Sequence, residues 1–179
     1  MTTLVLVFHP NLEESRVNRA IAEGLEHSDD VIVRRMYDLY PDFKIDVAEE
    51  QKHLAAADRI ILQFPFYWYS TPALLKQWQD DVLTYGWAFG STGTQLHGKE
   101  LLISTTTGAV GYQRDGEVKY TVEELLRPLQ ATSNLIGTKY LRPFILNNAL
   151  AISEEEINAY VEQFKQYITT DQELLGLYE

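Results

Sequence analysis

Three short segments of this sequence contain residue types that bind ligands in proteins. The first segment, "FHPNLEESRVN" (8–18), brings His9, Ser15, Arg16 and Asn18 to the start of a predicted helix. Free backbone N–H groups and the helix dipole favour a phosphate at such a position, and a hydroxyl and a guanidinium group add further donors. The alternative is that Ser15 is only an N-cap and Arg16 only a surface charge.

The second segment, "FPFYWYSTP" (64–72), contains four consecutive aromatic residues, which are Phe66, Tyr67, Trp68 and Tyr69. Aromatic side chains are common in protein cores and in subunit interfaces, and either use would explain them here. Since successive side chains of a strand point to opposite faces, four rings in a row cannot all point inward. Some of them must therefore face a pocket or a partner.

The third segment, "STTTGAVGYQRDG" (104–116), leads from small hydroxyl residues into Gly108, Gly111 and Tyr112. Glycine lets a backbone approach a ligand closely. Backbone N–H groups in this segment are then available to the polar edge of a planar ring. A flexible glycine-rich loop without a ligand is the alternative.

The elements that position these segments alternate along the chain between short aliphatic strands and amphipathic helices. This alternation predicts an α/β fold with a parallel sheet covered on both faces. We expect strands within 3–8, 30–37, 58–64, 99–106 and 137–149, and helices within 15–26, 46–57, 72–83, 121–135 and 153–168. The three segments then follow the first, third and fourth strands, where such sheets bind ligands. A flat, phosphorylated heteroaromatic molecule such as flavin mononucleotide (FMN) would use all three.

Composition narrows the range of functions. A length of 179 residues predicts one domain spanning residues 1–179, and the net charge of −11 argues against nucleic acid as a partner. The chain has no cysteine, and its four histidines are scattered, so we expect neither a disulfide nor a metal site. No apolar run is long enough to span a membrane and no signal peptide is evident, so we expect no membrane insertion and a cytoplasmic location.

The chain resembles the flavodoxin-like NAD(P)H:quinone oxidoreductases, the group that includes DT-diaphorase. Within this group it is most similar to small bacterial general-stress-type oxidoreductases and to the ancillary flavoproteins of potassium efflux systems. The resemblance extends from the first strand to "LRPF", and the motifs that carry it are "HP…S..N", "FPFYWYSTPALLKQW", "DDVLTYGWAFG", "STTTGA" and "ELLRPLQATSNLIG".

The resemblance implies a flavodoxin-like three-layer sandwich, in which helices cover both faces of a five-stranded parallel sheet of order 2-1-3-4-5. It also implies three groups of cofactor-binding residues. The phosphate and ribityl chain would meet His9, Ser15, Arg16, Val17 and Asn18. The isoalloxazine ring would be lined by Pro65, Phe66, Tyr67, Trp68 and Tyr69. The pyrimidine edge of the ring would meet Thr106, Thr107, Gly108 and Ala109.

Two positions depart from the family pattern. Family members often have two glycines after the threonine pair, whereas this chain has Gly108 and Ala109. DT-diaphorase has a Tyr and a His that are proposed to assist charge changes on the flavin. Tyr112 matches that Tyr, which makes it the candidate catalytic and cofactor-binding residue, but residues 98–179 contain no His.

These features together predict an FMN-dependent NAD(P)H:quinone oxidoreductase that transfers electrons in pairs by a ping-pong mechanism. NADPH or NADH would be the donor and a quinone or a similar planar molecule the acceptor. FAD is a second candidate for the cofactor, although no motif for its adenosine is visible. The resemblance further implies a homodimer with active sites at the subunit interface. The alternative function is that of an ancillary regulatory subunit, docked on a glutathione-gated potassium (cation) efflux transporter.

Overall fold

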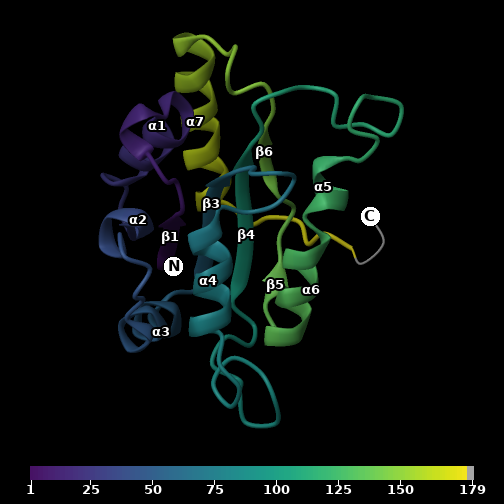
Figure 1. Cartoon of the computed structure of the whole chain (residues 1–179). Coiled ribbons are helices and arrows are strands. Elements are labelled where there is room, and N and C mark those ends of the chain that lie inside the picture. Colours follow the sequence, from purple (N-terminus) through teal and green to yellow (C-terminus); the bar gives the residue numbers. More distant parts are fainter. Residues whose placement is uncertain (177–179) are drawn as a thin grey trace.

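The computed structural model describes residues 1–176. The protein is built around one parallel sheet, whose strands differ in length (Figure 1). Its strands are β1 (Thr3–Val7), β2 (Val31–Arg35), β3 (Arg59–Pro65), β4 (Glu100–Thr106), β5 (Lys139–Tyr140) and β6 (Phe144–Leu146). They are arranged in the order β2-β1-β3-β4-β5, and β6 also pairs with β4. Every one of these pairings is parallel. The predicted sheet and strand order are confirmed.

Helices pack on both faces of the sheet and define two apolar cores. One core lies under α1 (Arg16–Leu25) and α7 (Glu154–Thr169). The other lies under α2 (Met36–Leu39), α3 (Val47–Ala56), α4 (Ala73–Val82), α5 (Val122–Leu125) and α6 (Arg127–Ile136). None of the helices formed by residues 1–176 is both long and apolar enough to cross a membrane.

Two helix boundaries differ from the prediction. The second strand ends at Arg35, and Met36 begins the short helix α2, because one helical turn carries the Met36 side chain into the core. The helix predicted over 121–135 is divided into α5 and α6 at Leu126. Pro128 explains the division, since its nitrogen cannot donate to the preceding turn and its ring is tolerated only at the start of a helix.

The predicted fifth strand is also divided, into β5 and β6. Pro143 lies between the two parts, and it supplies no N–H for a sheet ladder. Both parts nevertheless remain beside β4, with Lys139 opposite Glu100 and Phe144 opposite Ser104. The interruption therefore costs hydrogen bonds without changing the direction of the chain. The loop after β6 consequently reaches the same edge as the loops after β1, β3 and β4.

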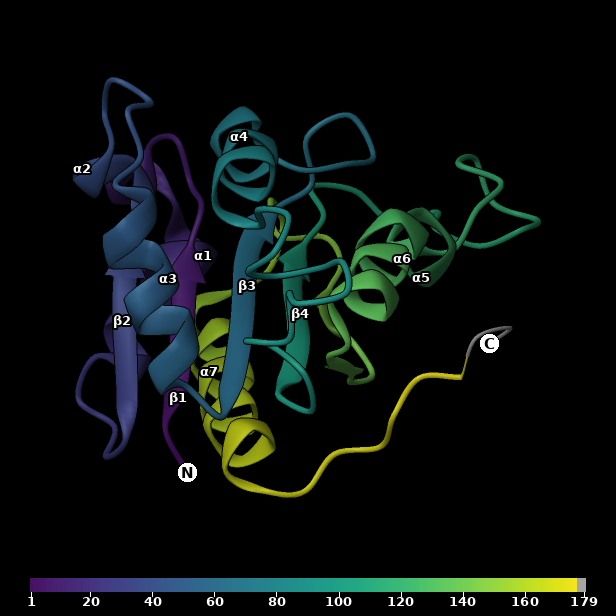
Figure 2. The same cartoon turned by 90° about the horizontal axis from the view of Figure 1, so that it is seen from below.

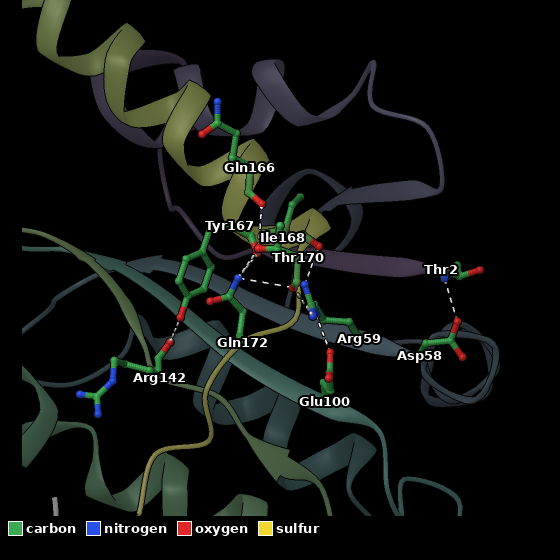
Figure 3. Close-up of polar contacts among 10 residues, drawn as sticks. All are labelled: Thr2, Asp58, Arg59, Glu100, Arg142, Gln166, Tyr167, Ile168, Thr170 and Gln172. Carbon is green, nitrogen blue, oxygen red and sulfur yellow. Dashed lines mark hydrogen bonds and ion pairs between the residues drawn. The ribbon is translucent and has the colours of Figure 1, made fainter.

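A buried arginine fastens the end of the last helix to the sheet (Figure 3). Arg59, the first residue of β3, has no exposed side-chain surface and donates to Glu100 Oε2 at 2.7 Å. It also donates to the carbonyl oxygens of Ile168 and Thr170 at 2.5 and 3.1 Å.

Beyond α7 the chain continues as an extended tail (Figure 2), in which Leu174 pairs antiparallel with Leu141. The tail thus covers the free edge of β5.

Candidate functional site

A cleft of about 370 Å³ lies at the carboxyl-terminal edge of the sheet. The strand ends that form this edge lie toward the top of Figure 1. Four loops form it, those that follow β1, β3, β4 and β6. Its lining consists of His9, Asn11, Glu14, Ser15, Arg16, Val17, Asn18, Pro65, Phe66, Tyr67, Thr106, Gly108, Ala149 and Leu150. The cleft therefore lies at the sheet edge where the sequence predicts a ligand-binding site.

At one end of the cleft, the loop after β1 supplies hydrogen-bond donors. Ser15 is the N-cap of α1, and its Oγ accepts from the Asn18 backbone N–H at 3.1 Å. His9 Nδ1 accepts from the Asn11 N–H at 3.1 Å. Partial burial lowers the pKa of His9, against the opposing effect of the Asn11 bond, so the neutral imidazole is favoured. Its hydrogen is then on Nε2, which remains available as a donor.

Arg16 lies at the same end of the cleft, but its charge is already paired. Its Nε and Nη2 both donate to Glu154 Oε1, at 2.9 and 2.6 Å, which joins the start of α1 to the first turn of α7. Both side chains are solvent-exposed, so the pair contributes little to stability. Arg16 lines the cleft, so an anionic ligand bound there would compete with Glu154 for the Arg16 guanidinium group.

The aromatic segment after β3 forms a tight hairpin. Tyr67 and Ser70 exchange backbone hydrogen bonds of 3.1 Å in both directions, which leaves a two-residue turn at Trp68 and Tyr69. Both turn residues have positive φ, of 50° and 62°, as in a type I′ turn. Trp68 is 92% exposed at the tip. Of the four rings, the first two line the cleft and Trp68 points out to solvent.

Tyr112 belongs to an aromatic cluster beside the cleft rather than to its lining. Its ring meets Phe66 edge-on, with centroids 6.0 Å apart, and Tyr69 at 6.4 Å. Burial raises the pKa of Tyr112, and the neighbouring Tyr69 adds to the shift. The phenol therefore keeps its proton at neutral pH and can act as a donor.

In the loop after β4, only part of the predicted binding surface faces the cleft. Thr106 and Gly108 line it. The Thr107 backbone N–H instead donates to the Leu146 carbonyl oxygen at 2.9 Å, and its hydroxyl donates to the Ala109 carbonyl oxygen at 2.8 Å. The first of these bonds holds the loop to β6, and the second lies within the loop. Leu150, which is 82% exposed, lies against Gly108, where a Cβ would come within 3.3 Å of its Cδ1.

Most of the residues predicted from the sequence converge on this one cleft. Those in its lining are His9, Ser15, Arg16, Val17, Asn18, Pro65, Phe66, Tyr67, Thr106 and Gly108. Those outside its lining are Trp68, Tyr69, Thr107, Ala109 and Tyr112. Sequence reasoning missed Asn11, Glu14, Ala149 and Leu150. Ala149 and Leu150 follow the divided fifth strand, so applying the strand-end rule to every strand would have found them.

Comparison with known proteins agrees with this architecture. The chain is 52% identical to general stress protein 14 of Bacillus subtilis, over 94% of this chain and 97% of the relative. It is 48% identical to the uncharacterized NAD(P)H oxidoreductase YrkL of B. subtilis, over 96% of this chain and 99% of the relative. It is 41% identical to KefF of Salmonella newport, an ancillary protein of the glutathione-regulated potassium-efflux system, over 96% of this chain and 97% of the relative.

Three solved structures superimpose closely. General stress protein 14 of Treponema denticola, in complex with FMN, has a TM-score of 0.85 at 37% identity, covering 94% of this chain and 97% of that one. The NADPH-quinone reductase of P. pentosaceus has a TM-score of 0.87 at 35% identity, covering 96% and 99%. A tryptophan halogenase structure from Streptomycin violaceusniger has a TM-score of 0.92 at 47% identity, covering 94% and 99%. Since these names differ, the fold alone assigns no reaction.

The family itself is clear from sequence and structure together. The model of the flavodoxin-like fold family matches residues 1–168, which include every strand and nearly all of α7. With its doubly wound parallel sheet and its cleft at the strand ends, the chain belongs to the flavodoxin-like fold family.

Proposed function

We propose that this protein is an FMN-dependent NAD(P)H:quinone oxidoreductase. The observation that carries the proposal is the combination, in one cleft of about 370 Å³, of a helix N-terminus with donor side chains and an aromatic wall. Such a cleft matches a ligand that is phosphorylated at one end and planar at the other. The FMN complex of the T. denticola relative and the reductase names of other relatives support the same ligand and reaction.

The residues of the cleft fit the phosphate end of FMN. Ser15 caps α1, whose first N–H groups have no partner within the helix, and His9 is held neutral with a donor on Nε2. Glu14 also lines the cleft, at the end of a short 3-10 helix (Leu12–Glu14). Arg16 can exchange Glu154 for the phosphate. The bound phosphate would thus receive several donors and one positive charge.

The other end of the cleft fits a planar ring. Phe66 and Tyr67 supply a wall, Gly108 admits close approach of backbone, and Leu150 adds an apolar side chain to the lining beside Gly108. When bound, the flavin supplies the redox chemistry that passes electrons in pairs between a nicotinamide and an acceptor. Tyr112 keeps its proton and is the candidate donor toward charge that develops at this end. Trp68, Tyr69, Thr107 and Ala109 complete the proposed contacts, either in a subunit interface or through backbone atoms.

We further propose a homodimer, since large apolar side chains are exposed around the cleft. They include Tyr67, Trp68, Tyr69 and Leu150. An exposed patch of this kind is typical of an interaction surface. A quinone stacked on the ring system would benefit from the same surface, because it would be shielded from water on both sides.

The test uses the purified full-length chain. We expect it to take up FMN, to show the yellow flavin spectrum, and to oxidise NADPH or NADH when a quinone is added. Mass analysis of the released cofactor distinguishes FMN from FAD, and parallel assays with the two nicotinamides identify the donor. A chain that takes up neither flavin, or a flavin-loaded chain that leaves both nicotinamides unoxidised, would refute the proposal.

The similarity to KefF favours a second candidate function, regulation of a potassium-efflux transporter by docking. The exposed aromatic residues at the rim of the cleft are equally suited to a transporter domain as partner. Both functions would use the same flavin site, so only the partner separates them. Co-purification of a tagged chain with a cation-efflux transporter from its own cells would favour the docking function.

A further inference from the structure

A chain of buried amide and hydroxyl groups runs beneath the phosphate end of the cleft. It begins at Gln63 on β3, whose side chain is 0% exposed and does not line the cleft. Gln63 Nε2 donates to Asn18 Oδ1 at 2.7 Å. Asn18 Nδ2 then donates to Thr106 Oγ1 at 3.1 Å and to Ser15 Oγ at 3.3 Å. Asn18 and Thr106 are also buried, so water does not compete for these bonds.

The direction of this chain decides which way the hydroxyl hydrogens point. Because Gln63 is the donor, Asn18 must present its oxygen to Gln63 and its NH₂ group to the two hydroxyls. Ser15 Oγ accepts from Asn18 twice, through the backbone N–H and through Nδ2, which occupies both of its lone pairs. Its own hydrogen is therefore directed to a third group, and Ser15 lines the cleft.

Thr106 lies on the other side of Asn18, which occupies one of the two lone pairs of its hydroxyl oxygen. Its Oγ1 accepts from Asn18 Nδ2, and its side chain also lines the cleft. Two hydroxyl groups from different elements, α1 and β4, are thus biased to donate into the same space. A phosphate presents only acceptor oxygens at neutral pH, so donors of fixed direction favour it over an uncharged group.

We propose that Gln63 is the positioning residue that gives the cleft its preference for a phosphorylated ligand, although it does not touch that ligand itself. It acts through Asn18, by keeping the Ser15 and Thr106 hydroxyls as donors toward the cleft. This inference rests on the proposed function, since it takes FMN as the ligand. The inference assigns a role to Gln63, which lies outside the cleft lining, and it explains why the Gln63 amide is buried in the sheet.

The first test compares FMN with riboflavin, which lacks the phosphate, on the apoprotein. We expect the wild type to bind FMN more tightly, measured by quenching of flavin fluorescence. Gln63→Met keeps the volume but removes the amide, and we expect it to lose FMN affinity on the order of 10-fold, as for hydrogen bonds to a charged group. The dissociation constant for riboflavin should change less than about 2-fold. Equal weakening of both ligands, or an unchanged ratio, would overturn the inference.

A second variant tests the direction of the chain. In Gln63→Glu, a protonated carboxyl group can still donate to Asn18, whereas an ionised one can only accept and would force Asn18 to turn. We therefore expect its ratio of FMN to riboflavin affinity, relative to wild type at the same pH, to fall between pH 6 and pH 9. A ratio that stays equal to that of the wild type across this range would overturn the proposed direction.

Thr105→Val is the matched control, because Thr105 also loses a buried sheet-end hydrogen bond, from its hydroxyl to the Phe64 carbonyl oxygen at 2.8 Å. Its side chain is not part of the chain of groups at Gln63, and its ratio of FMN to riboflavin affinity should match that of the wild type. If the wild type binds no flavin, the proposed function fails. If the wild type prefers FMN and Gln63→Met keeps that preference, only the present inference fails.

Discussion

At the scale of single residues, His9 links the cleft to pH. Its Nδ1 accepts from the Asn11 N–H, and burial lowers its pKa below the ordinary value of 6.5. In the unfolded chain His9 takes up a proton near its ordinary pKa, whereas in the folded chain it does so only at a lower pH. Its contribution to stability is therefore complete above pH 6.5 and is lost as the pH falls toward the folded pKa.

This linkage predicts the behaviour of His9→Gln, whose side chain does not titrate. The difference in melting temperature between wild type and His9→Gln should be larger in favour of the wild type at pH 7.5 than at pH 5. Thermal melts monitored by circular dichroism across this range provide the measurement. His27→Gln serves as the control for removal of a histidine away from the cleft. A difference that is the same at both pH values would contradict the prediction.

Single residues also show how far sequence reasoning reaches. Ser15 was predicted at the start of a helix from a local pattern, and it is the N-cap of α1 because capping depends only on neighbours in the chain. Leu150 was not predicted, because the strand-end rule was not applied to the fifth strand and an aliphatic residue by itself does not indicate that it is 82% exposed beside a glycine. Its position depends on β6 lying beside β4, which is a tertiary property.

At the scale of elements, the aromatic hairpin is a strained turn. Trp68 and Tyr69 both adopt positive φ, which costs about 1–2 kcal/mol for each residue that is not glycine. Asn-Gly is the preferred pair for such a turn. Since Trp68 is almost fully exposed, its ring recovers little of this energy within the subunit. Strain of this kind is typical of functional sites, where a ligand or a partner offsets it.

The double variant Trp68→Asn/Tyr69→Gly should therefore stabilise the isolated subunit by about 1–2 kcal/mol, after the loss of the Tyr69–Tyr112 contact. Urea unfolding measures the gain. The proposed dimer, followed by sedimentation, and the proposed quinone-dependent NAD(P)H oxidation should both weaken in the same variant. Trp68→Ala is the control, because it removes a ring and keeps the strained backbone. A double variant less stable than Trp68→Ala would show that the turn is not strained.

Arg59 makes the end of α7 depend on the beginning of β3. Replacing it with Met would remove the donor to the Ile168 carbonyl oxygen and the partner of Glu100, and would leave the Thr170 carbonyl oxygen with only a 3.4 Å bond from Gln172 Nε2. We expect Arg59→Met to lower the free energy of unfolding by about 3 kcal/mol, as when a buried ion pair loses one member. Chemical denaturation measures this loss. Glu100→Gln should cost less, since Glu100 is partly exposed, and equal stability of Arg59→Met and wild type would refute the argument.

Element boundaries were predictable where local chemistry decides them. Thr121 with Glu124 and Ser153 with Glu156 are each three residues apart, and both pairs form reciprocal capping boxes. At Asp46, only the aspartate makes its half of the box, since Glu49 Oε1 instead contacts His53 Nε2 at 3.0 Å. The division between α5 and α6 was not predicted. Pro128, which explains it, is visible in the sequence, but the apolar pattern continues through it and favoured a single helix.

At the scale of the whole molecule, the parallel sheet could be predicted from the alternation of strands and helices, whereas the order of the strands was implied by the resemblance to the flavodoxin-like oxidoreductases. The convergence of the loops after β1, β3 and β4 follows directly from that order. The hairpin at Trp68 could not be predicted, since the positive φ values of two non-glycine residues oppose their local preferences. The antiparallel pairing of Leu174 with Leu141 could not be predicted either, because it depends on the position at which the chain leaves the end of α7.

The contact of Arg59 with Ile168 and Thr170 has a consequence for synthesis on the ribosome. The partners are separated by 109 and 111 positions in the sequence, so β3 leaves the ribosome long before the end of α7 has been made. Until then, the guanidinium of Arg59 lacks two of its three acceptors and cannot be buried without a large cost. The nascent chain must therefore keep this end of the sheet hydrated, and folding can be completed only after the last helix has emerged.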